Sequence, residues 1–384
     1  MFDESRKVLN FDEMMELYNK IDNFDYVDEV IDNNITTRTF NYKLNIVNSF
    51  VKKGARNFRG TVFNLNTKEL IALPFFKFFN YNENIITKNT LVNKWIIKND
   101  YEKIDGSLIY FYKVNNKLFA RTQRSCTNKQ SIKALSIVNS DNDLKDYIED
   151  LIDNNYTPLF ELVAPLIDPH VITYDNEFLT FLGIRNMKTG QLIMSNSDIL
   201  PYKKYIDKLV TILPLKASNY LKIEDYVNEC KYHVENNRKD LLEGFVIEFT
   251  NGELVKIKYH QYITIHKMYD EIINDIKIVN RIFNNTLDDI MSEINYNGIN
   301  SSYVNNIIKC VDDTWNRNEK IGKEFYNKYK ELNKYDYYLK TKEELDEDQK
   351  YFALSFYNNK TDTSKLLNSY IANRKWRQSK YYNN

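Results

Sequence analysis

Hydrophobic and polar residues alternate along much of residues 36–258, and this period of two predicts β-strands. Turn residues separate the strands. Asn251-Gly252 predicts a tight hairpin between its flanking apolar runs, and Asn115-Asn116 and Asn66–Lys68 predict two more. The predicted strands cover residues 36–45, 59–64, 69–73, 93–98, 107–113, 117–121, 158–163, 170–174, 177–185, 245–249 and 253–258.

Helical spacing predicts helices over residues 12–19, 144–152 and 220–234, with Ser140 as the cap of the second. After about Met268 the strand alternation stops, and helical spacing with many charges continues to the C-terminus. The pattern therefore predicts an α+β fold. A first domain over residues 1–267 would contain antiparallel sheets with flanking helices, and residues 268–384 would form an all-helical domain.

Composition excludes several classes of protein. The chain of 384 residues is 43% hydrophobic, which allows a sizeable core, and its formal net charge of zero argues against coating nucleic acid through bulk charge. Three cysteines and four histidines show no zinc-ligand spacing, which fits a reducing cytosol. With no signal-peptide pattern and no membrane-spanning apolar run, we expect a cytoplasmic protein without membrane contact.

Lys103 is the first candidate for chemistry. It opens the pattern Lys-x-Asp-Gly-Ser, in a loop that leads into the predicted strand 107–113. A neutral lysine amine is a nucleophile, and Gly106 would let a phosphate approach the backbone. Taken alone, this stretch is equally compatible with a solvated lysine in a polar turn.

Three further residues suit a nucleotide site. Arg59, before Gly60, could bind phosphate oxygens through its guanidinium fork, or simply lie at the surface. Glu161 lies in an otherwise apolar strand, where a charge needs a partner: a ribose hydroxyl, a metal-bound water or a structural salt bridge. Glu243 precedes Gly244 and a buried strand, and its carboxylate suits the oxygen shell of a divalent metal.

Lys256 and Lys258 lie two residues apart on a predicted strand, so they share one face and Ile257 takes the other. Two ammonium groups on an inner face repel unless an anion lies between them, and a triphosphate would serve. Such positive neighbours are expected to lower the pKa of Lys103. An exposed strand face is the alternative.

Taken in order, these segments resemble the motifs of the covalent nucleotidyltransferases, the superfamily of ATP-dependent ligases and messenger-RNA capping enzymes. Within it the chain resembles the phage RNA ligase 1 family, the tRNA-repair ligases, over residues 35–295. The shared segments are Lys-x-Asp-Gly-Ser at 103–107, Phe-Glu-x-Val at 160–163, Glu-Gly-x-Val at 243–246 and Lys-x-Lys at 256–258, with flanking matches at 40–42, 59–60, 77–84 and 249–262.

The resemblance implies an ATP-dependent RNA ligase that joins 5′-phosphate and 3′-hydroxyl ends, with RNA, such as cleaved tRNA, as its partner during phage infection. Lys103 would carry AMP and Tyr262 would serve ligation. The implied ATP contacts are Tyr42, Arg59, Lys77, Lys103, Glu161 at the ribose, Glu243, Lys256 and Lys258. Asp288 and Glu243 would bind Mg²⁺, with Mn²⁺ as the alternative.

Some segments depart from the family pattern. Ile104 stands where the family usually has Glu, and Thr122–Ser125 replaces a Lys-Gly-Ser element. The helical C-terminal region differs most, so tRNA preference is not implied. Its lack of short alternating strands favours this family over DNA ligases and capping enzymes, which carry an OB-fold there.

Several alternatives stay open. The chain could be a catalytically inactive module that holds RNA ends, or a capping-type guanylyltransferase. Glu102 could reach the adenine amino group or be an ordinary exposed acid, and the basic, aromatic residues 374–377 could touch RNA or form a solvated helix end. The sequence does not indicate an oligomeric state.

Overall fold

The computed structural model describes residues 2–32, 35–195, 211–212, 220–235, 241–272, 274–283, 286–296 and 301–358. The chain divides into two compact units, residues 1–263 and 264–384. The basic, aromatic residues 374–377 lie outside the described residues.

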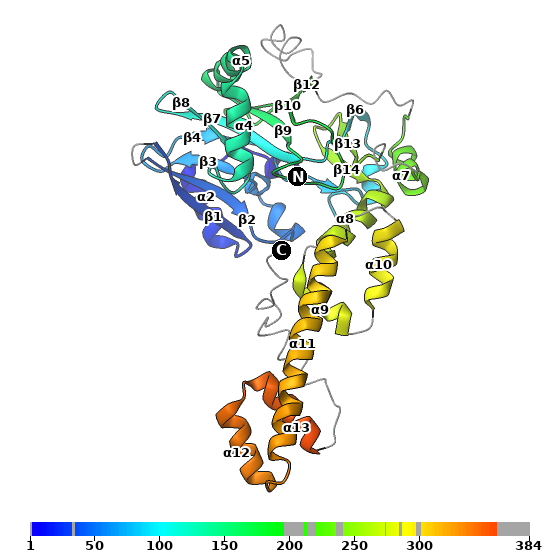
Figure 1. Ribbon diagram of the computed structural model, residues 1–384. Coiled ribbons are helices and arrows are strands. Elements are labelled where there is room, and N and C mark those ends of the chain that lie inside the picture. The colour runs from blue at the N-terminus through cyan, green and yellow to red at the C-terminus, as the bar shows by residue number, and fades with distance from the viewer. Residues whose placement is uncertain are drawn as a thin grey trace. The chain divides into compact units, whose positions relative to one another are not determined.

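Three β-sheets form the described part of the first unit (Figure 1). One is antiparallel in the order β1-β2-β3-β4, with β1 Phe24–Val30, β2 Thr36–Tyr42, β3 Thr61–Asn64 and β4 Leu70–Ala72. The second has the order β11-β10-β9-β7-β8, with β7 Ser107–Val114, β8 Lys117–Arg121, β9 Tyr156–Val163, β10 Phe178–Asn186, β11 Leu192–Met194, and β12 Thr211–Ile212 beside β10. The third has the order β5-β14-β13-β6, with β5 Phe79–Asn80, β6 Ile97–Glu102, β13 Gly244–Phe249 and β14 Leu254–Lys258.

The helices of the first unit cover the sheets and their connections. They are α1 Phe2–Ser5, α2 Phe11–Lys20, α3 Asn89–Val92, α4 Lys129–Asn139, α5 Asn142–Asp153 and α7 Ile223–Tyr232, with short 3-10 turns η2 Val47–Phe50 and η3 Ala55–Asn57. Helix α8, His260–Ile272, begins in this unit. The second unit contains α9 Asp275–Phe283, α10 Leu287–Tyr296, α11 Ser302–Tyr329, α12 Lys334–Glu344 and α13 Glu347–Asn358.

Two apolar cores hold the sheets on which the site depends. Helices α4 and α5 pack on β7, β8 and β9 (Figure 1), and the helical spacing of α5 turns Leu144, Ile148 and Leu151 toward Phe160 of β9. A second cluster contains side chains of both the six-stranded sheet and the sheet of β6, β13 and β14. Among its members are Phe75, Tyr101, Tyr110, Leu182 and Leu254. This cluster fixes the two sheets against each other.

The hairpins and the α+β class are confirmed. Asn251-Gly252 connects β13 to β14, and Asn115-Asn116 connects β7 to β8 with both asparagines at positive φ. The predicted helices over 12–19 and 220–234 correspond to α2 and α7. Helix α2 begins with a capping box between Asn10 and Glu13.

Four local predictions were wrong or incomplete. The strand placed at 93–98 begins at Ile97 and runs to Glu102, because residues 89–92 form α3. Residues 170–174 form no strand, since the Ile172 amide donates to the Asp105 side chain instead of a strand neighbour. Ser140 ends α4, a helix that was not predicted, and Asp141 caps α5 by accepting from the Leu144 amide at 3.0 Å. Strand β1, rich in acidic residues, was also missed.

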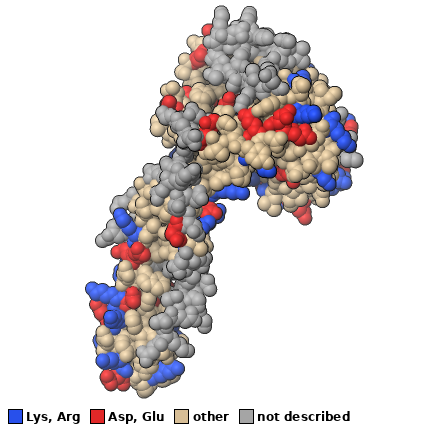
Figure 2. Space-filling model, turned by 90° about the vertical axis from the view of Figure 1, so that its right-hand side faces the viewer, with Lys and Arg blue, Asp and Glu red and all other residues tan. Residues whose placement is uncertain are grey.

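The second unit is built around the long helix α11, which packs against α9 and α13. Phe325, Tyr337 and Ala353 form its small buried cluster. In the described parts of the chain, no helix combines the length and apolar character needed to cross a membrane. On the face shown in Figure 2, basic side chains lie among acidic ones, in keeping with the zero net charge.

Candidate active site

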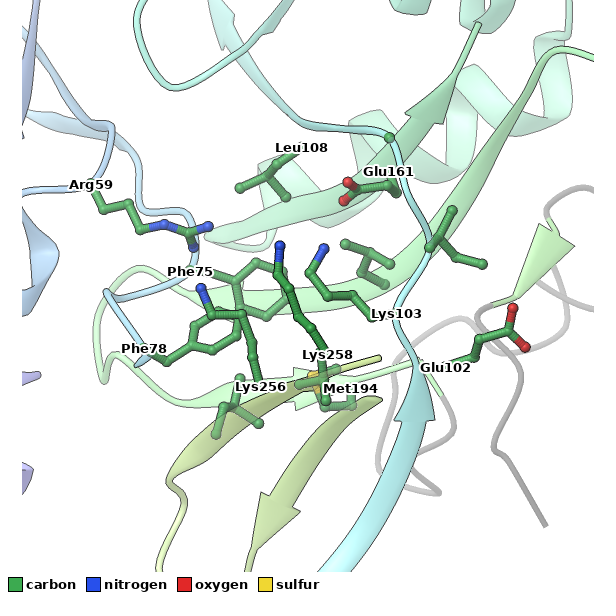
Figure 3. A pocket seen from close by; sticks show the side chains of 15 residues that line it. Arg59, Phe75, Phe78, Glu102, Lys103, Leu108, Glu161, Met194, Lys256 and Lys258 are labelled. Carbon is green, nitrogen blue, oxygen red and sulfur yellow. The ribbon is translucent and has the colours of Figure 1, made fainter. Parts of the chain in front are cut away.

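The candidate site is a pocket of about 300 Å³ whose walls come from two sheets (Figure 3). Strands β7, β9, β10 and β11 supply one wall, and β6, β13 and β14 supply the other. The lining residues are Arg59, Phe75, Phe78, Glu102, Lys103, Ile104, Gly106, Leu108, Glu161, Leu182, Met194, Val246, Leu254, Lys256 and Lys258.

Lys103 is placed by the end of β6. Its backbone N–H donates to the carbonyl of Gly244 at 2.8 Å, and Gly244 pairs in register with Lys258. Gly244 has φ +149°, and a Cβ there would approach the Ile257 carbonyl oxygen to 2.0 Å. Glycine at the first position of β13 therefore allows three strands to bring Lys103 and Lys258 together.

Gly106 lines the pocket, and the neighbouring strand β9 gives a second reason for a glycine at this position. A Cβ at this position would lie 2.5 Å from the carbonyl oxygen of Leu162, because β7 begins to pair with β9 at the next residue. Close strand packing, and not only access for a phosphate, therefore requires glycine here.

The Lys103 amine is paired with a carboxylate. Its Nζ lies 2.8 Å from Oε2 of Glu243, and Lys258 Nζ lies 2.9 Å from Oε1 of the same side chain. The Glu243 side chain is only 3% exposed. One buried carboxylate thus bridges two lysines, and the attraction between the opposite charges offsets the cost of burying them.

The expected lowering of the Lys103 pKa was wrong. Burial acts to lower this pKa, but the carboxylates of Glu243 and Glu161 outweigh it and hold the pKa above its ordinary value. Burial would likewise raise the pKa of Glu243, yet Lys103 and Lys258 keep it lowered. Without a nucleotide, the geometry therefore holds Lys103 as an ammonium.

Lys256 and Arg59 have a different environment. Within the described residues neither forms an ion pair, and both lie over the ring of Phe78, at 5.2 Å from its centroid for Lys256 Nζ and 5.3 Å for Arg59 Cζ. Arg59 Nη1 is buried and has no hydrogen-bond partner among the described residues. Burial, then Arg59, Lys77 and the other lysines, lower the pKa of Lys256 well below its ordinary value. No carboxylate of the described residues pairs with either group, so their chemistry suits a bound anion.

Glu161 points into the same space from β9. Figure 3 shows its carboxylate near the amine ends of Lys103 and Lys258, whereas Glu102 points away from them. No ion pair involves Glu161 in the part of the chain that the structure describes, although Lys103 and Arg59 act on its charge. Burial raises the pKa of Glu161 to about 7, although Lys103 and Arg59 oppose that change. An acceptor of this kind suits a hydroxyl or a metal-bound water.

Tyr42 and Lys77 lie together outside the pocket lining. Lys77 Nζ donates to the Tyr42 hydroxyl at 3.4 Å and lies 5.0 Å from the centroid of that ring. Arg124, from the segment that departs from the family pattern, donates to the Tyr42 carbonyl oxygen at 3.3 Å. Lys77 nevertheless contributes to the positive potential at Lys256.

Tyr262 is tied to the Lys103 loop. Its hydroxyl donates to Asp105 Oδ1 at 2.9 Å, and Lys258 Nζ lies 5.1 Å from its ring centroid. The sequence indicated Asp105 only as part of a motif. It did not indicate the groups that surround it, His170 and Asp168, which have no regular spacing from Lys103.

The metal ligands stay predictions. No group of three or more His, Cys, Asp or Glu side chains with metal-binding geometry occurs among the described residues. Glu243 bridges two lysines, and Asp288 is exposed near the start of α10 in the second unit. Carboxylate oxygens are nevertheless the donors that Mg²⁺ prefers, and Glu161 offers one that no cation of the described residues neutralises by direct contact.

Comparison with known proteins decides the family. The family model described as RNA ligase, that of the phage RNA ligase 1 family, matches residues 57–270, more than half of the chain. The chain belongs to this RNA ligase family. The match includes all the pocket residues that carry charge.

Two relatives extend the match. An inferred RNA ligase of Thermovibrio ammonificans is 28% identical over 264 residues, which are 66% of this chain and 64% of that protein. An inferred bifunctional polynucleotide kinase/RNA ligase of Autographa californica nuclear polyhedrosis virus is 29% identical over 253 residues, 61% of this chain and 34% of that protein. The chain thus covers less than two thirds of the length of each.

Two solved RNA ligases are similar to this RNA ligase family member in part of their structure. An archaeal ATP-dependent RNA ligase aligns with a TM-score of 0.44 at 13% identity, covering 72% of this chain and 68% of its own. A Naegleria gruberi RNA ligase mutant with AMP and Mn aligns with a TM-score of 0.37 at 14% identity, covering 49% of this chain and 56% of its own. The residue assignments rest on the pocket itself.

Proposed function

We propose that this protein is an ATP-dependent RNA ligase that joins a 5′-phosphate to a 3′-hydroxyl through a Lys103–AMP intermediate and an adenylylated RNA end. The observation that carries the proposal is the pocket: one lysine held against carboxylates, with unneutralised cations beside it. The nucleotidyl-transfer chemistry is assigned to residues 1–267, and RNA repair, with cleaved tRNA among the substrates, is the proposed setting.

In the first step Lys103 Nζ attacks the α-phosphorus of ATP. The N–P bond forms, the bond from the α-phosphorus to the bridging oxygen breaks, and pyrophosphate leaves. The Lys103 ammonium must release one proton before the attack and a second as the phosphoramidate forms, and both pass to solvent. A triphosphate beside Lys258 would supply the negative charge that Lys256 and Arg59 lack among the described residues.

Two transfers follow. An oxygen of the RNA 5′-phosphate attacks the AMP phosphorus, the N–P bond breaks and Lys103 regains a proton. The RNA 3′-hydroxyl then attacks the 5′-phosphate of the adenylylated end, loses its proton and displaces AMP. Tyr262 and Asp105 are assigned to this last step, Glu161 to the ribose, and Tyr42 and Lys77 to the rim of the nucleotide site.

A divalent metal, Mg²⁺ or Mn²⁺, would stabilise charge on the phosphate oxygens when bound. Glu243 is the proposed ligand on β13's side of the pocket, and Asp288 stays a predicted ligand. The protein's own contribution is positioning: Lys103 is fixed by Glu243, and the phosphate oxygens are oriented by Arg59 and Lys256.

A joining assay tests the proposal. A single-stranded RNA with a 5′-phosphate and a 3′-hydroxyl is incubated with the protein, Mg²⁺ and either ATP or GTP, and products are separated on a denaturing gel. Circular or longer RNA with ATP alone is expected. Joining supported by GTP in preference to ATP, or an RNA carrying a guanylate cap, would replace the ligase with the capping-type alternative. Retention of RNA without any new bond would favour the inactive binding module.

A further inference from the structure

His170 lies between two carboxylates next to the nucleotide pocket. Its Nε2 is 3.0 Å from Asp168 Oδ2, and its Nδ1 is 3.5 Å from Asp105 Oδ1. The three side chains are 24%, 16% and 5% exposed respectively, so the cluster is largely shielded from water. The mechanism above leaves this histidine without a role.

Both ring nitrogens face a carboxylate oxygen. A neutral imidazole carries one N–H, and only the imidazolium can donate at both nitrogens. The charged groups that act on the ring are Asp168, Asp105 and Glu161. Burial acts to lower the pKa of His170, but these acids outweigh it and raise the pKa above the ordinary value. The arrangement is that of a cation shared by two acids.

Each acid connects the histidine to a different part of the site. Asp168 also accepts from Ser107 Oγ at 2.6 Å, at the start of β7, and from Gln130 Nε2 at 3.1 Å, on α4. Asp105 belongs to the loop of the nucleophile.

The two carboxylate oxygens of Asp105 have separate partners. Oδ2 accepts from the Ile172 amide at 2.9 Å. Oδ1 accepts the Tyr262 hydroxyl at 2.9 Å and also faces His170. His170 and Tyr262 therefore converge on one oxygen atom, whereas the contacts that anchor the loop itself use the other oxygen and the backbone.

We propose that His170, as an imidazolium, is a positioning residue for the RNA-joining step, because it fixes Asp105 Oδ1 and through it the hydroxyl of Tyr262 beside Lys258. The inference rests on the proposed function and adds to it a charge requirement in one step. Lys103 keeps its own anchors, the Gly244 carbonyl and Glu243, so formation of the lysine adduct does not depend on His170.

A pH dependence follows from the geometry. The folded-state pKa of His170 is raised, so the imidazolium is present below that pKa and is lost as the pH rises through it. Joining of a pre-adenylylated RNA, which needs no nucleophilic lysine, is expected to weaken along this alkaline limb. A permanently charged side chain at position 170 should remove this loss of joining at alkaline pH.

The test compares His170→Asn, which keeps a polar group without the charge, with His170→Arg, which keeps the charge and can donate to both acids. At pH 7 the asparagine variant is expected to join pre-adenylylated RNA about tenfold more slowly, with adduct formation from ATP within about threefold of wild type. The arginine variant should restore joining and show no alkaline loss attributable to this group. His266→Asn serves as the control, since His266 also faces an aspartate, Asp270, at 3.3 Å but is not among the residues that line the pocket.

Unchanged joining by a folded His170→Asn protein overturns the inference, as does an arginine variant that joins as slowly as the asparagine variant. A wild type that forms neither an adduct nor joined RNA overturns the proposed function itself, which is a different result. Proton NMR titration of His170 needs no activity. We expect its pKa above the ordinary histidine value in wild type and a downward shift in Asp105→Asn; an ordinary or lower wild-type pKa contradicts the shared-cation geometry.

Discussion

The two sides of the pocket differ in whether their cationic side chains are paired with a carboxylate. On one side Lys103 and Lys258 share Glu243, with both Nζ–O distances below 3 Å. On the other side Lys256 and Arg59 lie over the Phe78 ring, and no carboxylate among the described residues pairs with either. The same few strands therefore hold one balanced group of charges and one unbalanced group.

The difference separates two tasks. A buried ion pair fixes geometry, because moving either partner leaves a charge uncompensated. A buried cation without a partner is costly until an anion arrives, so it favours the bound state of a phosphate over the empty pocket. We infer that the Glu243 side places the nucleophile and that the Phe78 side binds the triphosphate.

The largest expected effect comes from Lys103→Ala. Removing the nucleophile should reduce AMP adduct formation by more than about 10⁴-fold. Joining of pre-adenylylated RNA should persist, because that step uses no lysine nucleophile. Adduct formation is followed with α-labelled ATP on a denaturing gel, and joining with a chemically adenylylated RNA. An AMP adduct in the alanine variant would show that Lys103 is not the nucleophile.

A matched pair on one strand separates the two sides directly. Lys256→Met and Lys258→Met should each slow adduct formation by about 10²-fold. Their effects on the free energy of unfolding should differ in sign. Lys256→Met removes an unpaired buried charge and should stabilise the nucleotide-free protein by about 1 kcal/mol, whereas Lys258→Met should destabilise it by about 1 kcal/mol. Urea unfolding measures both. If both variants changed the free energy of unfolding in the same direction, the two sides of the pocket would not differ in charge balance.

Glu243→Gln should change the pH dependence of the first step. Glu243 raises the pKa of Lys103. Removing the charge of Glu243 should therefore shift the increase of adduct formation with pH to lower pH. The rate should also fall by about tenfold, because the amine loses its ionic anchor. Glu248→Gln in β13, the strand that Glu243 precedes, is the control. The Glu248 carboxylate contacts Lys98 and Tyr101, and its substitution should leave the profile in place. An unmoved profile in Glu243→Gln would show that this carboxylate does not set the charge of Lys103.

The last prediction concerns Glu161 and the pH dependence of the free energy of unfolding. Its folded-state pKa is raised to about 7, from 4.5. For an acid with a raised pKa, the unfolded state binds fewer protons, so stability falls as the pH rises from about 4.5 to 7. Glu161→Gln should remove about 2 kcal/mol of that pH dependence. Chemical unfolding of both proteins at pH 5 and pH 7.5 checks this; identical slopes with pH would place Glu161 in a more polar setting.

The sequence predicted positions along one strand better than contacts between strands. Strand alternation was sufficient to put Lys256 and Lys258 on one face, since the period is fixed by backbone geometry. The pairing of Lys103 with Glu243 joins residues 140 positions apart and depends on β6 lying beside β13. No periodicity encodes such a contact, and the direction of the Lys103 pKa was predicted incorrectly for that reason.

The same limit explains the missed histidine. Residues 170–174 contain enough β-branched and aromatic residues to resemble a strand. In the structure, however, the Ile172 amide donates its hydrogen bond to the Asp105 side chain. Helix α5 and the Asn-Gly hairpin, in contrast, follow from local patterns and were predicted well. Local periodicity thus gave the elements, and tertiary pairing decided which charges meet.

The central claim is that Lys103 is the residue that carries the nucleotide, and identification of the modified residue tests it most directly. The wild-type protein is incubated with Mg²⁺ and ATP, digested at neutral or alkaline pH, where a phosphoramidate survives, and its peptides are analysed by mass spectrometry. Intact mass before incubation shows whether AMP is already bound. AMP is expected on the peptide that contains Lys103, in a linkage that is acid-labile and alkali-stable. AMP on Lys256 or Lys258, or an adduct with the stability of an ester, would contradict it.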